Sequence, residues 1–117
     1  MDLQATNRYL RLTVRLLEKA GSEYKMPVFK RAAEILSRPR RKRVVVNVGK
    51  LNRVANDGDV VLVPGKVLGG GVLSKKVTVA AWGFSRSAIE KIKAAGGEAI
   101  TIQELIRRRP KGIKIVV

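Results

Sequence analysis

The sequence predicts an α/β fold: an irregular α/β core of short strands and helices with an N-terminal helical extension. Two observations favour this fold class. In residues 1–43, apolar side chains recur at helical spacing and a run of cations follows them. From Val44 on, short β-branched runs alternate with helical patterns. Because 117 residues suit one domain, we expect a single domain, 1–117. It would comprise a basic helical extension and basic segment (1–43) and an α/β core (44–117).

The N-terminal third predicts an amphipathic helix with one basic face. On a helical wheel the basic face holds Arg8, Arg11, Arg15 and Lys19. The opposite, apolar face holds Leu3, Leu10, Val14 and Leu17. Leu12 and Leu16 lie beside the basic face, where a partner could cover them, and Gly21 is the expected end of the helix. We interpret the basic face as an RNA contact, with a solvated cationic face as the alternative.

A second helix and a basic segment are expected next. Pro27 suits the first turn of a helix, and the buried face would hold Phe29, Ala32, Ala33 and Leu36, with the end within 37–39. The basic segment then holds Arg38, Arg40, Arg41, Lys42 and Arg43 around Pro39. Because Pro39 disfavours helix at Arg38, the segment should be extended and able to follow a phosphate backbone. A solvated linker or a targeting signal is the alternative.

The first half of the core predicts three strands. Residues 44–48 form a buried strand, 49–56 a short helical turn, and 56–59 (Asn-Asp-Gly-Asp) a tight turn. A second strand covers 60–63 and is expected to turn at Pro64–Gly65. A glycine-rich loop, Gly69, Gly70 and Gly71, precedes a third strand over 77–82.

The second half of the core predicts two helices and two short strands. Ser85 could cap a helix that runs to about Ala95, and Gly96–Gly97 would end it. Residues 99–100 read as a short strand, and 101–104 (Thr-Ile-Gln-Glu) as a capping box that begins a last short helix. Arg107, Arg108, Arg109 and Pro110 close that helix, and the alternation over 113–117 predicts a terminal strand.

The charge of the chain is strongly unbalanced, with 25 Lys and Arg against 9 Asp and Glu and a net charge of +16. So much like charge repels itself in the compact state, and a polyanion relieves the repulsion. Nucleic acid is the usual partner of such chains, with a membrane surface as the rival. Because no apolar run is long enough for a membrane span and the first residues lack a secretory pattern, we expect a cytoplasmic protein without a membrane partner.

The composition argues against an enzyme. The chain contains no Cys and no His, so thiolate metal sites and the commonest general base are excluded. Asp57 and Asp59 form the only close pair of carboxylates in the sequence, and a turn with satisfied side chains is favoured over a metal site. We expect no catalytic residue, no metal, no cofactor and no small-molecule substrate. A small enzyme that uses Lys66, Asp57 or Asp59 is the alternative.

The glycine-rich segment does not match a nucleotide-binding loop. Val60 stands where a P-loop needs Gly, Val67 follows Lys66 in place of Ser or Thr, and Ser74 stands at the third glycine of a dinucleotide loop. Exposed N–H groups of the glycines, together with Lys66, Lys75 and Lys76, could instead grip an RNA phosphate. A plain connection between strands is the alternative.

The scarce aromatic residues favour recognition of folded RNA. Single-strand binders stack bases on aromatic platforms, and Trp82 with Phe84 could form at most a small one, with core packing favoured. We therefore expect a protein that reads RNA shape and backbone.

A resemblance to a known family is carried by residues 63–69, 75–81, 84–85 with Ala88 and Ile92, and 95–97, joined by 38–41, 46–47, 51–53 and 101–105. In these stretches the sequence closely resembles archaeal ribosomal protein eighteen-e, a family called ribosomal protein eighteen in eukaryotes and related to bacterial ribosomal protein fifteen. The chain departs from the family pattern at Val28–Phe29 and Trp82–Gly83. It also lacks the long basic tail of eukaryotic members, which favours the archaeal form.

The resemblance implies the irregular α/β core shared with the bacterial protein. It also implies a structural role in the large ribosomal subunit, where the protein would bind and brace ribosomal RNA and support assembly and translation. Neighbouring large-subunit ribosomal proteins would be secondary partners. A DNA-binding architectural protein is the alternative, although neither dimer symmetry nor a helix-turn-helix is evident. The expected RNA-binding residues are Arg8, Arg11, Arg15, Arg38, Arg40, Arg41, Lys42, Arg43, Lys50, Arg53, Lys66, Gly69, Gly70, Gly71, Lys75, Lys76, Arg86, Arg107, Arg108, Arg109 and Lys111.

Overall fold

The structure, a computed structural model, describes residues 3–39 and 43–117, with side chains from Arg8 onward. The chain divides into two compact units, Met1–Arg43 and Val44–Val117. The described part of the first consists of two helices, and the second is an α/β unit, so the predicted fold class is confirmed. The expectation that residues 1–117 form a single domain stays a prediction. Arg40, Arg41 and Lys42 lie outside the described residues.

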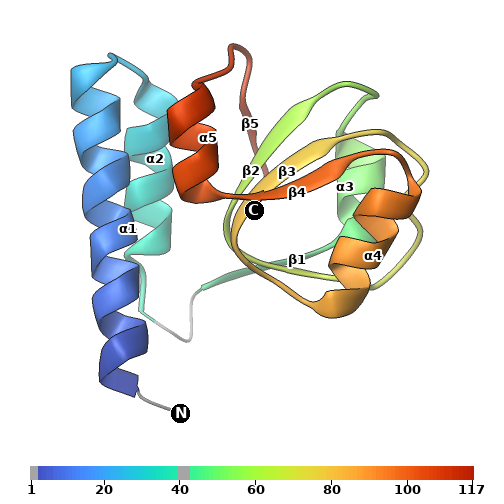
Figure 1. Cartoon of the computed structure of the whole chain (residues 1–117), viewed down its shortest axis with the longest axis horizontal. Helices are drawn as coiled ribbons and strands as arrows, with labels where there is room; N and C mark the ends of the chain where they lie inside the picture. The colour runs from blue at the N-terminus through green and yellow to red at the C-terminus, as the bar shows by residue number, and fades with distance from the viewer. Residues whose placement is uncertain (1–2, 40–42) are drawn as a thin grey trace. The chain divides into compact units, whose positions relative to one another are not determined.

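The N-terminal unit is a helical hairpin of α1 (Leu3–Glu23) and α2 (Pro27–Leu36), which lie side by side (Figure 1). The second helix begins and ends where the sequence predicts, with Pro27 in its first turn. Its buried residues are Phe29, Ala32, Ala33, Ile35 and Leu36. On α1, Leu17 and Ala20 are buried, and Thr13 is buried with its hydroxyl donating to the carbonyl of Tyr9 at 3.0 Å.

The prediction that Gly21 ends the first helix is wrong. α1 continues to Glu23, and Lys25 supplies the left-handed backbone beyond its end, with φ of 53°. The N–H of Met26 donates to the carbonyl of Gly21 at 3.0 Å, which is the closing bond of a Schellman motif. A Cβ on Gly21 would lie 2.6 Å from Cγ of Lys30. This glycine therefore permits close packing of α1 on α2 and does not terminate α1.

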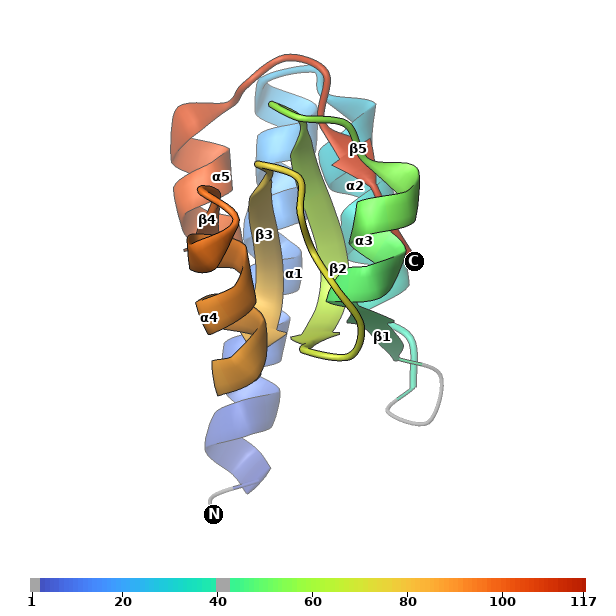
Figure 2. The same cartoon turned by 90° about the vertical axis from the view of Figure 1, so that its right-hand side faces the viewer.

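The core unit is built on a parallel five-stranded sheet. The strands β1 (Val44–Asn47), β2 (Val60–Leu68), β3 (Thr78–Phe84) and β4 (Glu98–Thr101) are neighbours in that order. β5 (Lys114–Ile115) pairs with Val61 and Leu62, near the start of β2, whereas β1 pairs with the later residues 65–68 of the same strand. The helices α3 (Val48–Val54) and α4 (Arg86–Ala94) cover one face, and α5 (Ile102–Arg108) covers the other (Figure 2).

The predicted turn at Pro64–Gly65 is wrong, because β2 continues through both residues to Leu68. The register with β3 shifts between Val63 and Lys66, so β2 is irregular there. Such a bulge is a position where a sheet tolerates proline. A Cβ on Gly65 would lie 2.1 Å from the carbonyl oxygen of Val44. The glycine thus lets β1 approach β2, which is why a turn-like dipeptide lies inside a strand.

Gly65→Ala should destabilise the core by about 1–3 kcal/mol, because the new methyl group must displace the backbone of β1. The free energy of unfolding in denaturant measures the loss. Gly83→Ala is the matched control: the nearest atom to its added Cβ is Cγ of Lys66, at 3.9 Å, so a change below about 1 kcal/mol is expected. Equal stability of both variants would contradict the close approach of β1.

Local capping signals correctly locate α4 and α5. The hydroxyl of Ser85 accepts from the N–H of Ala88 at 3.2 Å, and α4 ends before Gly96, whose φ is +87°. Of the two hydrogen bonds in the predicted capping box at Thr101, the structure has the one accepted by the Thr101 side chain. Thr101 Oγ1 accepts from the N–H of Glu104 at 3.1 Å, whereas the Glu104 carboxylate accepts from arginines of α5.

Candidate nucleic-acid interface

The predicted RNA-binding cations separate into two groups by their partners within the protein. The first group has none among the described residues, and each of its side chains is exposed. This group consists of Arg8, Arg11, Arg15, Arg38, Arg53, Lys66, Lys76, Arg86 and Lys111. They come from both units and from helices, strands and loops, so their full charge faces solvent. Arg43 and Arg109 do have interactions within the protein.

The second group already holds partners. Lys50 Nζ donates to the carbonyl of Val117, and Lys75 Nζ donates to the carbonyl of Ala55 at 2.6 Å. A cation that the prediction did not include, Lys91, donates to the carbonyls of Gly69 and Gly71, both at 2.6 Å. Ammonium groups held in this way organise the backbone as well as adding positive charge.

Arg107 and Arg108 belong to an ion-pair network on α5. Arg107 Nε donates to Glu104 Oε1 at 3.0 Å, Arg108 Nε donates to Glu104 Oε2 at 2.7 Å, and Arg108 Nη1 reaches Glu98 Oε1 at 2.7 Å. Hydrogen bonds from Arg107 and then Arg108 lower the pKa of Glu104 from its ordinary 4.5 to about 2. The hydrogen bond from Arg108 also lowers the pKa of Glu98. Two carboxylates therefore offset part of the positive charge of this arginine cluster.

The network predicts an acid-sensitive contribution to stability. Because the folded-state pKa of Glu104 is depressed, its stabilising effect is complete above pH 4.5 and is lost as the pH falls toward 2. Unfolding at about pH 5 and at about pH 2.5 should show a smaller acid loss for Glu104→Gln than for the unaltered protein. An identical pH dependence in the two proteins would contradict the ion pairs.

The two carboxylates considered as a metal pair already accept hydrogen bonds within the protein. Asp57 Oδ1 accepts from the N–H of Lys76 at 2.8 Å. Asp59 Oδ2 accepts from the N–H of Asn56 at 2.8 Å and contacts Lys114 Nζ at 3.1 Å. These contacts, led by the Asn56 N–H, lower the pKa of Asp59. The interpretation as a satisfied turn is confirmed, and within 3–39 and 43–117 no three acidic side chains gather as a metal site.

The glycine-rich segment begins the connection between β2 and β3, which runs between α3 and α4 (Figure 2). Gly70 is held at both peptide groups: its N–H donates to Asn47 Oδ1 at 2.9 Å, and its carbonyl accepts from the N–H of Gly49 at 2.9 Å. The N–H of Gly70 is thus already donated within the protein. The sequence pointed to the glycines and lysines of this segment but missed Asn47 and Lys91, which hold it in place from other elements.

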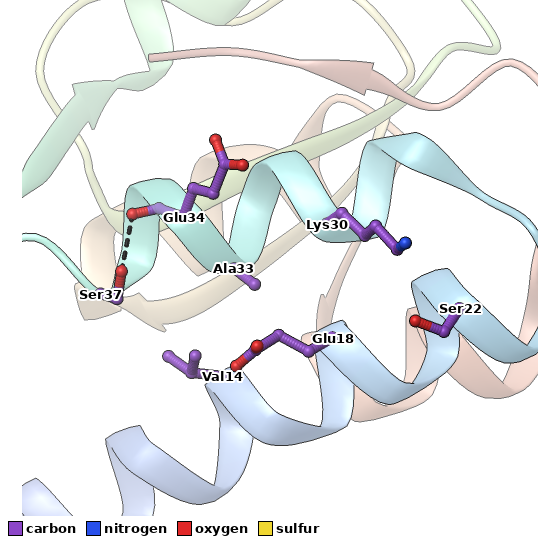
Figure 3. Close-up of a pocket in the computed structure, with 7 residues that line it drawn as sticks. All are labelled: Val14, Glu18, Ser22, Lys30, Ala33, Glu34 and Ser37. Carbon is purple, nitrogen blue, oxygen red and sulfur yellow. Dashed lines mark hydrogen bonds between the residues drawn. The ribbon is translucent and has the colours of Figure 1, made fainter.

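A groove of about 380 Å³ lies between the two helices of the N-terminal unit (Figure 3). Its lining residues are Val14, Glu18, Ser22, Lys30, Ala33, Glu34 and Ser37. In Figure 3 the Glu34 carboxylate points away from α1, and the Lys30 ammonium points toward Ser22. The polar groups of this groove therefore do not converge on one point, as a catalytic or ligand site would require.

Similarity to known proteins identifies the family. A family model described as covering the 50S ribosomal proteins L15 and L18e, together with a 60S ribosomal protein, matches residues 40–100. The chain belongs to this family. The match to the L15 and L18e family includes the glycine-rich connection and four of the predicted cations that are exposed and have no internal partners among the described residues, which are Arg53, Lys66, Lys76 and Arg86. Among the described helices of this family member, none is long and apolar enough to cross a membrane.

Individual relatives are similar over nearly the whole chain. Large ribosomal subunit protein eL18 of Pyrobaculum aerophilum is 51% identical over 114 residues, which cover 96% of this chain and 93% of the relative. The protein of the same name from Methanopyrus kandleri is 54% identical over 112 residues, or 92% and 88% of the two chains. That of Methanococcus maripaludis is 44% identical over 115 residues, or 98% and 96%. The similarity therefore includes the N-terminal helices.

Proposed function

We propose that this protein is a structural constituent of the large ribosomal subunit that binds and stabilises folded ribosomal RNA. Family membership carries the proposal, because relatives that match it over nearly their full length are named large ribosomal subunit protein eL18. The net charge of +16 supports it independently, since a polyanion is needed to offset so much positive charge. The protein would act in the cytoplasm, within the ribosome, and support subunit assembly and translation.

The binding chemistry would come from those predicted cations that are exposed and have no partners among the described residues. Arg53, Lys66, Lys76 and Arg86 belong to the core unit, and Arg8, Arg11 and Arg15 follow one face of α1. Each can neutralise a phosphate and release counterions, which provides affinity without reading sequence. Specificity would then come from the shape of the folded RNA. Neighbouring large-subunit ribosomal proteins would be the remaining partners.

The protein would contribute by binding alone, without catalysis. The carboxylates of Asp57 and Asp59 already accept hydrogen bonds from backbone N–H groups, and Lys66 lies exposed on β2 without a partner among the described residues. A nucleophile, a base and an orienting group within hydrogen-bond reach are needed for catalysis of the usual kinds. We find no such set among the described residues.

Co-sedimentation of the tagged protein in a cell extract tests the proposal. The protein should migrate with large ribosomal subunits on a sucrose gradient. Ribonuclease should shift it to the top of the gradient, and deoxyribonuclease should leave it in place. Migration with DNA after ribonuclease treatment would contradict the ribosomal role and favour a DNA-binding architectural protein.

A further inference from the structure

The connection between β2 and β3 takes an unusual path, because parallel strands are commonly joined by a crossover helix. Here residues 69–77 contain no helix and instead run between α3 and α4 (Figure 2). We propose that this connection is a preformed RNA-docking element, in which Val72 is an apolar contact and Lys91 is a positioning residue. The inference rests on the proposed function and names a contact site within it.

Hydrogen bonds to β1, α3, α4 and the segment between α3 and β2 hold the connection in place. At its start, Asn47 binds the N–H of Gly70 and Lys91 binds the carbonyls of Gly69 and Gly71. Near its middle, Asn52 Oδ1 accepts from the N–H of Ser74 at 3.0 Å. Toward its end, Lys75 Nζ donates to the carbonyl of Ala55, and the N–H of Lys76 donates to Asp57 Oδ1. Polar groups along the connection are thus satisfied within the protein, which gives an irregular segment a defined conformation.

Close packing adds to these hydrogen bonds. A Cβ on Gly69 would lie 2.1 Å from Oγ of Ser87 on α4, and one on Gly71 would lie 2.8 Å from Cα of Gly49 on α3. The connection is therefore in contact with both flanking helices. A segment fixed in this way loses little conformational entropy when a partner binds it.

Val72 projects from this fixed backbone. Its side chain is 73% exposed, the highest value among the large hydrophobic residues described, whereas the adjacent Leu73 is 8% exposed and belongs to the core. Leu73 therefore fixes the connection to the core, and the neighbouring side chain of Val72 faces solvent. An exposed apolar side chain on a preorganised backbone has the properties of an interface contact.

The surrounding charge favours RNA as the occupant. The exposed side chains of Arg53 on α3 and of Lys76 have no partners among the described residues, and Lys75 and Lys91 add two more positive charges. A surface that combines cations with one apolar side chain suits the phosphates and the ribose or base faces of folded RNA. Lys91 differs from the other cations because its ammonium is bound by two carbonyls, so it would act by holding the connection.

The Val72 contact is tested with purified full-length protein and a transcript of large-subunit ribosomal RNA, with Kd measured over a range of salt concentrations. Val72→Ser should weaken binding about tenfold at every salt concentration, because the loss of apolar burial is not screened. Val117→Ser is the matched control, since Val117 is 50% exposed and lies outside the connection. The Kd of the Val117→Ser variant for the transcript should equal that of the unaltered protein. Equal affinities for Val72→Ser and the unaltered protein would overturn the inference.

The role of Lys91 is separated from that of a phosphate contact by comparing Lys91→Met with Lys93→Met. Both residues lie on α4, but Lys93 is exposed and has no partner among the described residues. Lys91→Met should weaken RNA binding about tenfold with an unchanged salt slope, and should speed hydrogen exchange of the Gly70 N–H. Lys93→Met should leave that exchange rate unchanged. Unchanged Gly70 exchange in Lys91→Met would overturn the positioning role, as would a salt slope reduced by about one.

The outcomes separate this inference from the proposed function. If the unaltered protein binds the transcript but Val72→Ser binds equally well, the docking element fails and the RNA-binding function remains. If the unaltered protein does not bind the transcript, both fail. If Val72→Ser keeps its RNA affinity but loses a neighbouring ribosomal protein from reconstituted subunits, Val72 contacts protein and the RNA assignment is overturned.

Discussion

The affinity of the protein for large-subunit ribosomal RNA should fall at least about a thousandfold between 50 and 200 mM salt, as expected for six or more neutralised phosphates. The physical reason is the number of exposed cations that have no partners within the described part of the protein and are distributed over both units. Each phosphate contact releases counterions, and the gain from that release shrinks as bulk salt rises. Filter binding or fluorescence anisotropy over a salt series measures the slope.

A matched measurement on a fully double-stranded DNA of equal length provides the control. Its affinity should also depend on salt, but it should be weaker than that for folded ribosomal RNA at every concentration, because the RNA shape adds contacts that the DNA lacks. A nearly flat salt response with ribosomal RNA would show that phosphate neutralisation is not the basis of binding.

Replacing Arg40, Arg41, Lys42 and Arg43 together by Ser should weaken RNA binding at least about a hundredfold at about 100 mM salt. The salt slope should fall by about three, because Arg43 already has an interaction within the protein. The segment holds adjacent cations without a neighbouring acid, so we expect it to follow a phosphate backbone. Thermal unfolding should stay cooperative with little change in Tm, because the sheet and its helices lie outside this segment.

The control for this variant removes four charges elsewhere, with Lys25, Lys30, Arg31 and Lys93 changed to Gln. These positions are not among the expected RNA contacts, so the slope should change much less. Equal effects of the two variants would show that only total charge matters. Loss of cooperative unfolding in the Ser variant would show that the segment has a structural role.

Local signals in the sequence were sufficient for most elements of the fold. Helical spacing and Pro27 located α2, and Ser85 with Gly96 located α4. These patterns work because caps and amphipathic faces act within a few residues. The errors at Gly21 and Pro64–Gly65 have one cause. In each case the glycine lies inside its helix or strand and allows a neighbouring element to pack closely against it. Gly21 allows the approach of α2, and Gly65 allows the approach of β1.

The candidate site was predicted less completely than the fold. Charge and glycine content indicated which segments could contact RNA, but not which cations have partners. Glu98 binds Arg108 across ten residues, and Lys91 binds glycines about twenty residues away. Such partners are set by the packing of helices and strands, which no local pattern encodes. The exposure of Val72 beside the buried Leu73 likewise depends on that packing.

By itself, the sequence determined the α/β class, the boundary of the basic extension near Arg43, and a surplus of positive charge that calls for a polyanionic partner. These properties follow from composition and short-range periodicity. Only the tertiary structure decided which cations remain available and that the glycine-rich connection is held between α3 and α4. The physical reason is that hydrogen bonds and close contacts between distant segments exist only after the sheet has brought those segments together.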